Sequence, residues 1–167
     1  GCEGYVAPGS RFDKSGNMSS NRYHHLVLLA ENDTGYHNLM KIVSKGFTEG
    51  FYYKPRVDKA LLRQHSEGLI ALSACLAGEI PRTLMGANKL ITNGGTFDDA
   101  IRQTQEYMDI YDGRFYLEVQ ANTLPDQATL NNKLLELAEH TKVPLVATND
   151  CHYLNADDVE AHDVLLC

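Results

Sequence analysis

Short apolar runs alternate with amphipathic stretches along most of the chain, and this alternation limits the possible folds more than any other feature. Runs typical of strands are expected near residues 3–7, 26–30, 69–72, 115–119 and 145–147. Between them, apolar residues recur at three- and four-residue spacing, as on one face of a helix. A strand–helix alternation predicts an α/β fold with a parallel sheet or barrel, with an open sheet as the alternative to a barrel.

Capping residues place the helices between these strands. Asn32 or Asp33 is expected to cap the first long helix, and Gly46 is expected to close it. Asp58 precedes a short helix, and Thr96 caps a second long one. By residue count, the alternation amounts to about two-thirds of a (β/α) barrel.

Composition and charge narrow the class of protein. The chain has 167 residues, of which 43% are hydrophobic and 22% charged, which is typical of one globular domain. The net charge of −7 gives no overall basic field for nucleic acid, so any such contact must be local, metal-mediated or made by other parts. No apolar run approaches the roughly 20 residues of a membrane helix. The start at Gly1, with neither Met nor signal peptide, indicates a fragment of a longer cytoplasmic protein.

Several common functional motifs are missing. The four cysteines are scattered without a Cys-x-x-Cys pair, which argues against a zinc ribbon, a thioredoxin-type site and a disulfide framework. The sequence also has no P-loop, no Gly-x-Gly-x-x-Gly and no Gly-x-Ser-x-Gly. Nucleotide-cofactor enzymes and serine hydrolases therefore lack support.

Asp150 and His152 follow the apolar run 145–147 and the turn-forming Asn149. The run is predicted to be a buried strand of a parallel sheet, and sites in α/β folds lie just beyond such strand ends. Asp-x-His supplies one oxygen and one imidazole nitrogen, a pair suited to Zn²⁺ or Mn²⁺. The alternative is that Asp150 caps the next turn and His152 packs beneath it.

Further metal-ligand types occur at or beside predicted strand ends: Glu3, His25 and Cys75. The polar loop between the first two strands allows an antiparallel hairpin, in which Glu3 and His25 could face one site. Cys75 could instead be a buried free thiol. With Asp150 and His152, these residues could hold two or three ions of zinc, manganese or magnesium, which activate water and clamp a phosphate. Phosphoester hydrolysis is the chemistry expected, with Glu3, Asp150 and His152 as the candidate catalytic residues.

Two other histidines bear on this site. His24 competes with His25, but alternation along a strand places the two on opposite faces, so only one can face the site. His162 lies on the final predicted helix and could support the site from behind the ligands.

Phe51 to Arg56 is an aromatic and basic stretch. Tyr53, Lys54 and Arg56 are candidate substrate-binding residues, because aromatic and basic side chains can stack on a nucleotide and neutralise its charge. The alternative is ordinary packing with a solvated edge.

The candidate ligands sit in segments that resemble a known family. Its motifs recur here in the family's order and cover nearly the whole chain: Gly1-Cys-Glu-Gly-Tyr-Val-Ala-Pro8, Tyr23-His-His-Leu-Val-Leu-Leu-Ala30, Gly35-Tyr-His-Asn-Leu-Met-Lys-Ile-Val-Ser44, Glu49-Gly-Phe-Tyr-Tyr-Lys-Pro-Arg56, Glu67-Gly-Leu-Ile-Ala-Leu-Ser-Ala-Cys-Leu-Ala-Gly-Glu-Ile80, Val146-Ala-Thr-Asn-Asp-Cys-His-Tyr-Leu154 and Glu160-Ala-His-Asp-Val-Leu-Leu-Cys167. The chain resembles the polymerase-and-histidinol-phosphatase (PHP) domain of the bacterial DNA polymerase III alpha subunit.

The resemblance implies that residues 1–167 form an incomplete, distorted (β/α)7 PHP barrel. The family's His-x-His strand and Asp-His-Gly strand are not in this sequence, nor are the polymerase palm, fingers and thumb. The family's remaining ligand positions match Glu3, His25, Cys75, Asp150 and His152, and the family fills the Cys75 position with Cys or His. The fragment alone is therefore expected to bind metal poorly.

The resemblance also implies a role in replication. The parent protein would be a DNA-directed DNA polymerase that copies bacterial chromosomes, with DNA, a proofreading exonuclease subunit and the sliding clamp as partners. The PHP domain itself would be a metal-dependent 3′–5′ exonuclease or, alternatively, an inactive scaffold that binds a separate exonuclease subunit. The retained ligands favour the first reading. A free-standing PHP phosphatase is disfavoured because the loop motifs match the polymerase branch.

Overall fold

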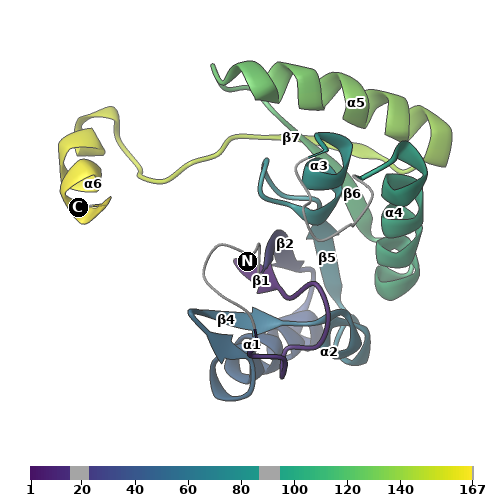
Figure 1. Ribbon diagram of the computed structural model, residues 1–167. Coiled ribbons are helices and arrows are strands. Elements are labelled where there is room, and N and C mark those ends of the chain that lie inside the picture. Colours follow the sequence, from purple (N-terminus) through teal and green to yellow (C-terminus); the bar gives the residue numbers. More distant parts are fainter. Residues whose placement is uncertain (16–22, 87–94, 167) are drawn as a thin grey trace.

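Seven strands form one sheet in the computed structural model of the chain, which describes residues 1–15, 23–86 and 95–166 (Figure 1). The spatial order of the strands is β3-β4-β1-β2-β5-β6-β7. The strands are β1 (Cys2–Val6), β2 (His24–Ala30), β3 (Phe51–Tyr52), β4 (Lys54–Val57), β5 (Leu69–Leu72), β6 (Phe115–Gln120) and β7 (Leu145–Thr148). The helices are α1 (Asp33–Thr48), α2 (Lys59–Gln64), α3 (Glu79–Leu84), α4 (Phe97–Tyr111), α5 (Pro125–Thr141) and α6 (Val159–Leu166), with a 3₁₀ turn η1 (Ala156–Asp158) before α6.

The α/β class is confirmed, but the sheet is mixed rather than parallel. Strand β2 runs antiparallel to both of its neighbours, β1 and β5. The pairs β1–β4, β5–β6 and β6–β7 are parallel. Antiparallel neighbours can be joined without a helical crossover, and β2, the next strand along the chain, pairs directly with β1. The hairpin expected from the polar loop is thereby confirmed.

Helices α1 to α5 pack on one face of the sheet, which leaves the other face for polar groups. Alternation along β6 puts Phe115 and Leu117 into a single hydrophobic core and turns Glu118 to the opposite face. Leu26 and Leu28 of β2 point into the same core. We call the opposite side the inner face; it carries Glu3, His25, Val27, Glu118 and Gln120.

The helix starts follow the expected caps. The side chains of Asn32 and Asp58 accept hydrogen bonds from the backbone N–H groups of Gly35 and Leu61, at 3.0 and 2.9 Å. Thr96 forms a capping box at the start of α4. The predicted end at Gly46 is wrong, because α1 continues to Thr48.

Two expectations for the strands need correction. The stretch Phe51 to Arg56, interpreted as a patch, lies on strands β3 and β4 and the residue between them. The stretch 145–147 is a strand, but it is not buried: the side chain of Leu145 is 38% exposed and Ala147 is also exposed. Strand β7 stands last in the sheet and pairs only with β6, so its outer edge has no neighbour among the described residues.

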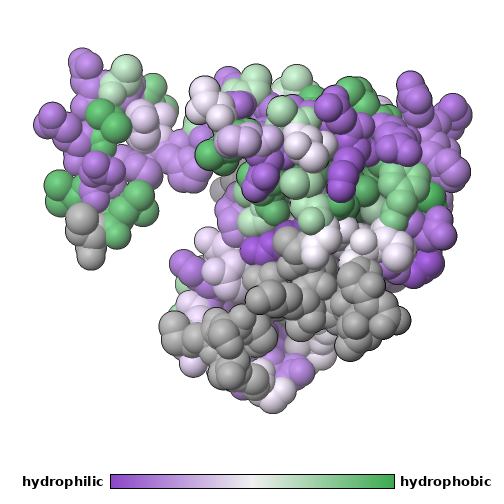
Figure 2. Space-filling model, turned by 45° about the horizontal axis from the view of Figure 1, so that its top comes forward, coloured by the Kyte–Doolittle hydropathy of each residue, from purple (hydrophilic) through white to green (hydrophobic). Residues whose placement is uncertain are grey.

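Helix α6 stands apart from the body of the molecule (Figure 1). It contributes no buried residue, and Val164, Leu165 and Leu166 are all more than 70% exposed. Figure 2 shows hydrophobic residues on the lobe that contains α6. The face of the body that is visible in the same view is a mixture of hydrophilic and hydrophobic residues. Among the described residues, no helix combines the length and apolarity needed to cross a membrane. The predicted loops at residues 10–22 and 86–95 fall largely outside the described residues.

Candidate metal centre

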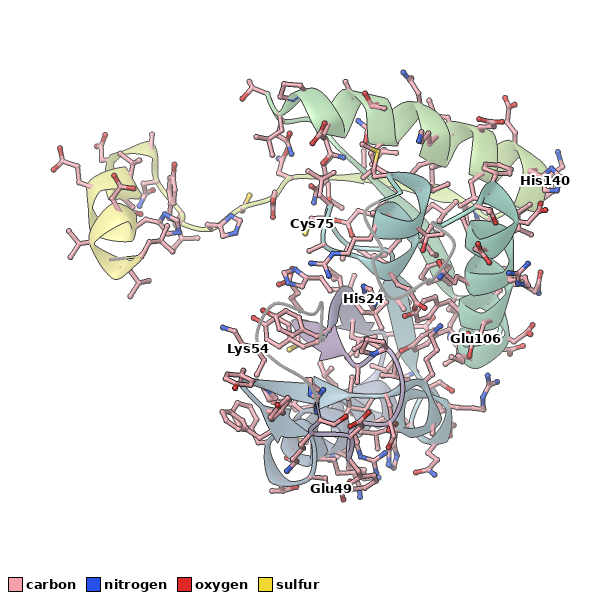
Figure 3. All side chains as sticks on the ribbon, viewed as in Figure 1. His24, Glu49, Lys54, Cys75, Glu106 and His140 are labelled. Atoms are coloured by element: carbon pink, nitrogen blue, oxygen red, sulfur yellow. The ribbon has the colours of Figure 1, made fainter. Side chains whose placement is uncertain are left out.

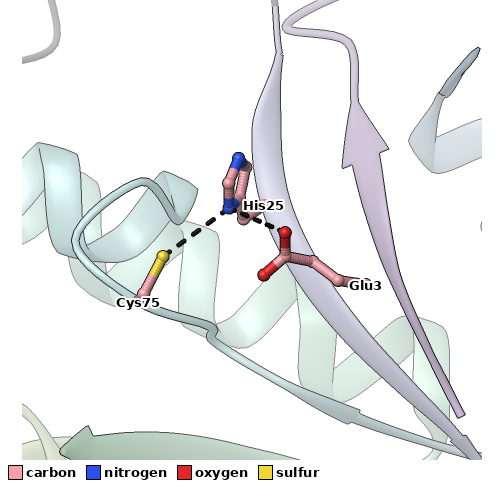
Figure 4. A group of neighbouring side chains, drawn as sticks. All are labelled: Glu3, His25 and Cys75. Atoms are coloured by element: carbon pink, nitrogen blue, oxygen red, sulfur yellow. Dashed lines mark hydrogen bonds and ion pairs between the residues drawn. The ribbon is translucent and has the colours of Figure 1, made fainter. Parts of the chain in front are cut away.

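Three of the predicted ligands meet on the inner face (Figure 4). The Nδ1 atom of His25 lies 3.1 Å from Oε1 of Glu3 and 3.6 Å from Sγ of Cys75. One ligand atom from each residue lies within 4.8 Å of the other two. Among the described residues, this cluster is the one group of three or more His, Cys, Asp or Glu side chains spaced to hold a metal ion. We call it the triad.

The antiparallel pairing of β1 and β2 brings the first two members together. Glu3 lies opposite Val27 and Tyr5 lies opposite His25, so Glu3 and His25 are diagonal neighbours on one face. Such neighbours are within reach of long side chains. The backbone register therefore sets the distance between the carboxylate and the imidazole.

A tight turn after β5 brings Cys75 to the other two. Ala74 adopts a left-handed conformation, with φ of 62°, and is fully buried. A non-glycine residue in this region is uncommon and is held there by its surroundings. Backbone hydrogen bonds supply that restraint: Gly78 N–H donates to the Cys75 carbonyl at 2.8 Å, and His25 N–H donates to the Ala77 carbonyl at 3.1 Å. The turn is thus tied directly to the strand that carries His25.

The electrostatics of the triad favour charged groups. Hydrogen bonding with Cys75, and then with Glu3, raises the pKa of His25 to about 9, although partial burial opposes this. The same His25 contact lowers the pKa of Glu3, with a smaller contribution from the charge of His152. One imidazole nitrogen thus lies between a carboxylate and a thiol, and the carboxylate is stabilised by the positive charge of the ring.

The donor set fits a zinc-type ion. Imidazole nitrogen, thiolate sulfur and carboxylate oxygen are the usual zinc ligands, and in a tetrahedral site their atoms lie about 3.4–3.6 Å apart. The measured N–S distance of 3.6 Å falls at this spacing and the N–O distance of 3.1 Å slightly below it. The three side chains could therefore hold one ion with small adjustments.

Asp150 and His152 follow β7, as expected, but they do not join the triad. Asp150 lines a hollow of ≈ 300 Å³ together with Glu3 and Cys75. His152 is more exposed, and its Nδ1 lies 2.9 Å from the backbone carbonyl oxygen of Asp150 and 4.0 Å from the carboxylate. The structure brings Asp150 to the same hollow as the triad, and it leaves His152 at the margin. Their roles as ligands remain predictions.

His162 contacts this margin rather than the triad. Its ring centroid lies 5.7 Å from that of His152 and 5.3 Å from that of Tyr153. Support of the site by His162 could therefore act only through His152, and it remains a prediction.

His24 points away from the site, as alternation requires. Its side chain is 2% exposed, on the face covered by the helices, where burial lowers its pKa to about 4. Nδ1 of His24 has no hydrogen-bond partner among the described residues. His24 therefore behaves as a neutral core residue.

Lowering the pH from 7 to about 4.5 should destabilise the protein through His24. The pKa of His24 is near 6.5 in the unfolded chain and about 4 in the folded protein. Between pH 6.5 and 4, the unfolded chain therefore binds the proton more readily than the folded protein. The contribution of His24 to the free energy of unfolding is present in full above pH 6.5. It declines by up to about 3 kcal/mol as the pH approaches 4. Urea unfolding at several pH values measures this. In a His24→Leu variant, the free energy of unfolding should fall less steeply between pH 7 and about 4.5 than in the wild type. His37→Gln, at an exposed position, should fall as steeply as the wild type. Equal pH dependence in all three proteins would contradict the assignment.

The aromatic and basic stretch divides into buried and exposed members. Arg56 is 4% exposed, and its guanidinium donates to the backbone carbonyls of Gly50 and Asp13 at 3.3 and 2.7 Å. This geometry gives Arg56 a structural role and removes it from any substrate surface in this structure. Tyr53 and Lys54 are exposed where β3 turns into β4, and Figure 3 labels Lys54 there. A substrate-binding role for both remains a prediction.

Two residues of the hollow were not predicted as site residues. Glu118 and Gln120 of β6 line it together with Glu3, Cys75 and Asp150, and both are almost completely buried. The sequence signal was available: a glutamate inside an otherwise apolar strand, with a glutamine two positions later on the same face.

Comparisons with known proteins give a family match and similar relatives. The PHP domain family matches residues 1–122. The chain is 46% identical over 168 residues to the DNA polymerase III subunit alpha of Treponema pallidum, with 100% of the chain and 14% of that protein covered. It is 44% identical over 167 residues to the subunit of the same name from Thermus aquaticus, with 99% and 13% covered. The corresponding protein of Borreliella burgdorferi is 41% identical, with 100% and 14% covered. The chain thus spans about a seventh of the length of these curated relatives.

Proposed function

The chain belongs to the PHP domain family, and from this premise we propose that it forms part of a divalent-metal site for phosphoester hydrolysis within a DNA polymerase III alpha subunit. The observation that carries the proposal is the triad, in which carboxylate, imidazole and thiol converge from two strands and a restrained turn. These are three of the side-chain types that bind zinc, and their convergence supports a metal-binding role.

The residues that would hold metal are the triad together with Asp150 and His152 from the segment after β7. Bound divalent ions would lower the pKa of coordinated water and neutralise phosphate charge. Glu3, Asp150 and His152 supply the polar groups that would orient the phosphoester against the sheet. The substrate that fits a polymerase subunit is the 3′ end of DNA, which makes the reaction a 3′–5′ exonuclease step.

The names of the relatives support a proposal for the larger assembly. We propose that strands outside this chain complete a (β/α)7 barrel over the inner face and add histidine and aspartate ligands. The alpha subunit as a whole would synthesise DNA on a template in the bacterial cytoplasm, with a proofreading subunit and the sliding clamp as partners. The relatives named DNA polymerase III subunit alpha support this assignment.

The test is metal content and nuclease activity of the full-length alpha subunit beside a Glu3→Gln variant. The proposal expects two or three zinc or manganese ions per chain by elemental analysis, at least one of them lost in the variant, with 3′–5′ hydrolysis of DNA reduced roughly a hundredfold or more. Glu139→Gln, which removes a carboxylate from the exposed side of α5, is the matched control. It should keep the metal content and the nuclease activity of the wild type. An alpha subunit that is free of stoichiometric metal would overturn the proposal and leave the domain as a scaffold for a separate exonuclease.

A further inference from the structure

The hollow beside the triad is lined by two buried residues, Glu118 and Gln120, that each have an oxygen atom without a partner among the described residues. Glu118 and Gln120 are 4% and 5% exposed. Within the described part of the chain, neither Oε2 of Glu118 nor Oε1 of Gln120 has a hydrogen-bond partner. Buried polar atoms without partners are rare in folded proteins, and each destabilises the fold, more so when it is charged. Both atoms are acceptors, so each calls for a donor or a cation.

The surrounding contacts orient the carboxylate and leave one of its oxygens available. Oε1 of Glu118 accepts from the hydroxyl of Thr148 on β7 and, at 3.4 Å, from the amide nitrogen of Gln120. The backbone N–H of Glu118 donates to Oγ of Ser73 at 2.8 Å. These bonds fix the residue between β5 and β7 while Oε2 stays unpaired. Metal-ligating carboxylates are commonly held in this way by hydrogen bonds to their other oxygen.

The lining of the hollow favours a cation over any anionic group. It contains the carboxylates of Glu3, Glu118 and Asp150 and no lysine, arginine or histidine side chain. A phosphate could not enter such a surface without positive charge to neutralise it. Of the residues that line the hollow, Glu118, Gln120 and Asp150 offer only oxygen atoms as metal donors, from two carboxylates and a side-chain amide. The triad offers nitrogen and sulfur as well. Oxygen donors prefer hard ions such as Mn²⁺ and Mg²⁺, and mixed nitrogen and sulfur donors prefer zinc.

We propose that Glu118, Gln120 and Asp150 form an oxygen-only subsite for a hard divalent cation, Mn²⁺ or Mg²⁺, beside the triad. The subsite deepens the proposed phosphoesterase function and rests on it. It assigns β6, a strand outside the predicted ligand set, to the site. A cation of magnesium or manganese type would then lie beside the triad, whose donor set suits zinc.

The test uses Glu118→Gln in the full-length alpha subunit, because the substitution keeps the shape and the acceptor for Thr148 while it removes the charge. Mn²⁺ binding is measured by titration with electron paramagnetic resonance, and zinc by elemental analysis of the same sample. The subsite predicts that Mn²⁺ binds roughly tenfold or more weakly, while the zinc content stays at the wild-type level and reports an intact fold. Glu139→Gln on α5 should leave both ions unchanged.

The possible results separate the two proposals. Unchanged Mn²⁺ affinity with zinc retained would overturn the subsite and leave the triad and the proposed function standing. Loss of both ions in Glu118→Gln would overturn the idea of an independent subsite and make Glu118 a structural support. Absence of both ions from the wild-type protein would overturn the proposed function itself.

Discussion

Replacing Cys75 with serine should weaken Zn²⁺ binding roughly a hundredfold while it changes Mn²⁺ binding by less than about tenfold. Thiolate is a soft ligand that zinc strongly prefers, and a serine hydroxyl remains protonated and binds zinc poorly. Sγ of Cys75 lies 3.6 Å from Nδ1 of His25, so the substitution removes a donor from the triad without moving the strands. Competition with a chromophoric chelator measures the zinc affinity of the full-length protein.

The matched control for this prediction is Cys2→Ser. Cys2 is also a half-buried free thiol, but it packs against the hydrophobic core rather than in the triad. The Cys2→Ser variant should keep the zinc affinity within about twofold of wild type, because the sulfur of Cys2 is not part of the triad. Equal losses of zinc and manganese in Cys75→Ser would indicate that Cys75 only packs and hydrogen-bonds in the turn. The selectivity of the loss, rather than its size, therefore decides the role of the thiol.

Parts of the site could be predicted because they depend on local signals. The antiparallel return from β1 to β2 follows from a polar loop between two short strands, and it alone brings Glu3 beside His25. Alternation along β2 separates His24 from His25 without knowledge of any partner. Helix caps such as Asp58 act within three residues of sequence, so they too are visible in the sequence.

Other features depend on contacts between distant segments, which the sequence does not show. Glu118 is an ordinary strand glutamate until Thr148 of β7, 30 residues further on, occupies one of its oxygens. Arg56 resembles a surface cation until the chain near Asp13 folds over it. The apolar run 145–147 suggests burial, but burial depends on whether another strand or helix covers β7. In each case the missing information is the identity of the tertiary neighbour.

Replacing Gly35 with alanine should destabilise the protein by about 3 kcal/mol or more. A Cβ atom on Gly35 would lie 1.7 Å from the carbonyl oxygen of Gly68 and 2.4 Å from its carbon. These are backbone atoms, so no side-chain rotation can relieve the overlap. Gly68 itself has φ of 69°, and its carbonyl also accepts from the backbone N–H of Glu31 at 2.9 Å. The start of α1 would have to move away from the turn before β5, and that hydrogen bond would be strained.

Gly46→Ala in the same helix is the matched control. There the nearest atoms to an added Cβ are the Pro55 carbonyl oxygen and a Val57 methyl, both at 3.4 Å, which is ordinary contact. Alanine also has a higher helix propensity than glycine by about 1 kcal/mol, so this variant should be neutral or slightly more stable. Urea unfolding of both variants measures the difference. Similar stabilities would mean that α1 does not rest directly on the Gly68 backbone, whereas a loss confined to Gly35→Ala would identify that junction as the place where α1 is joined to the strand leading to Cys75.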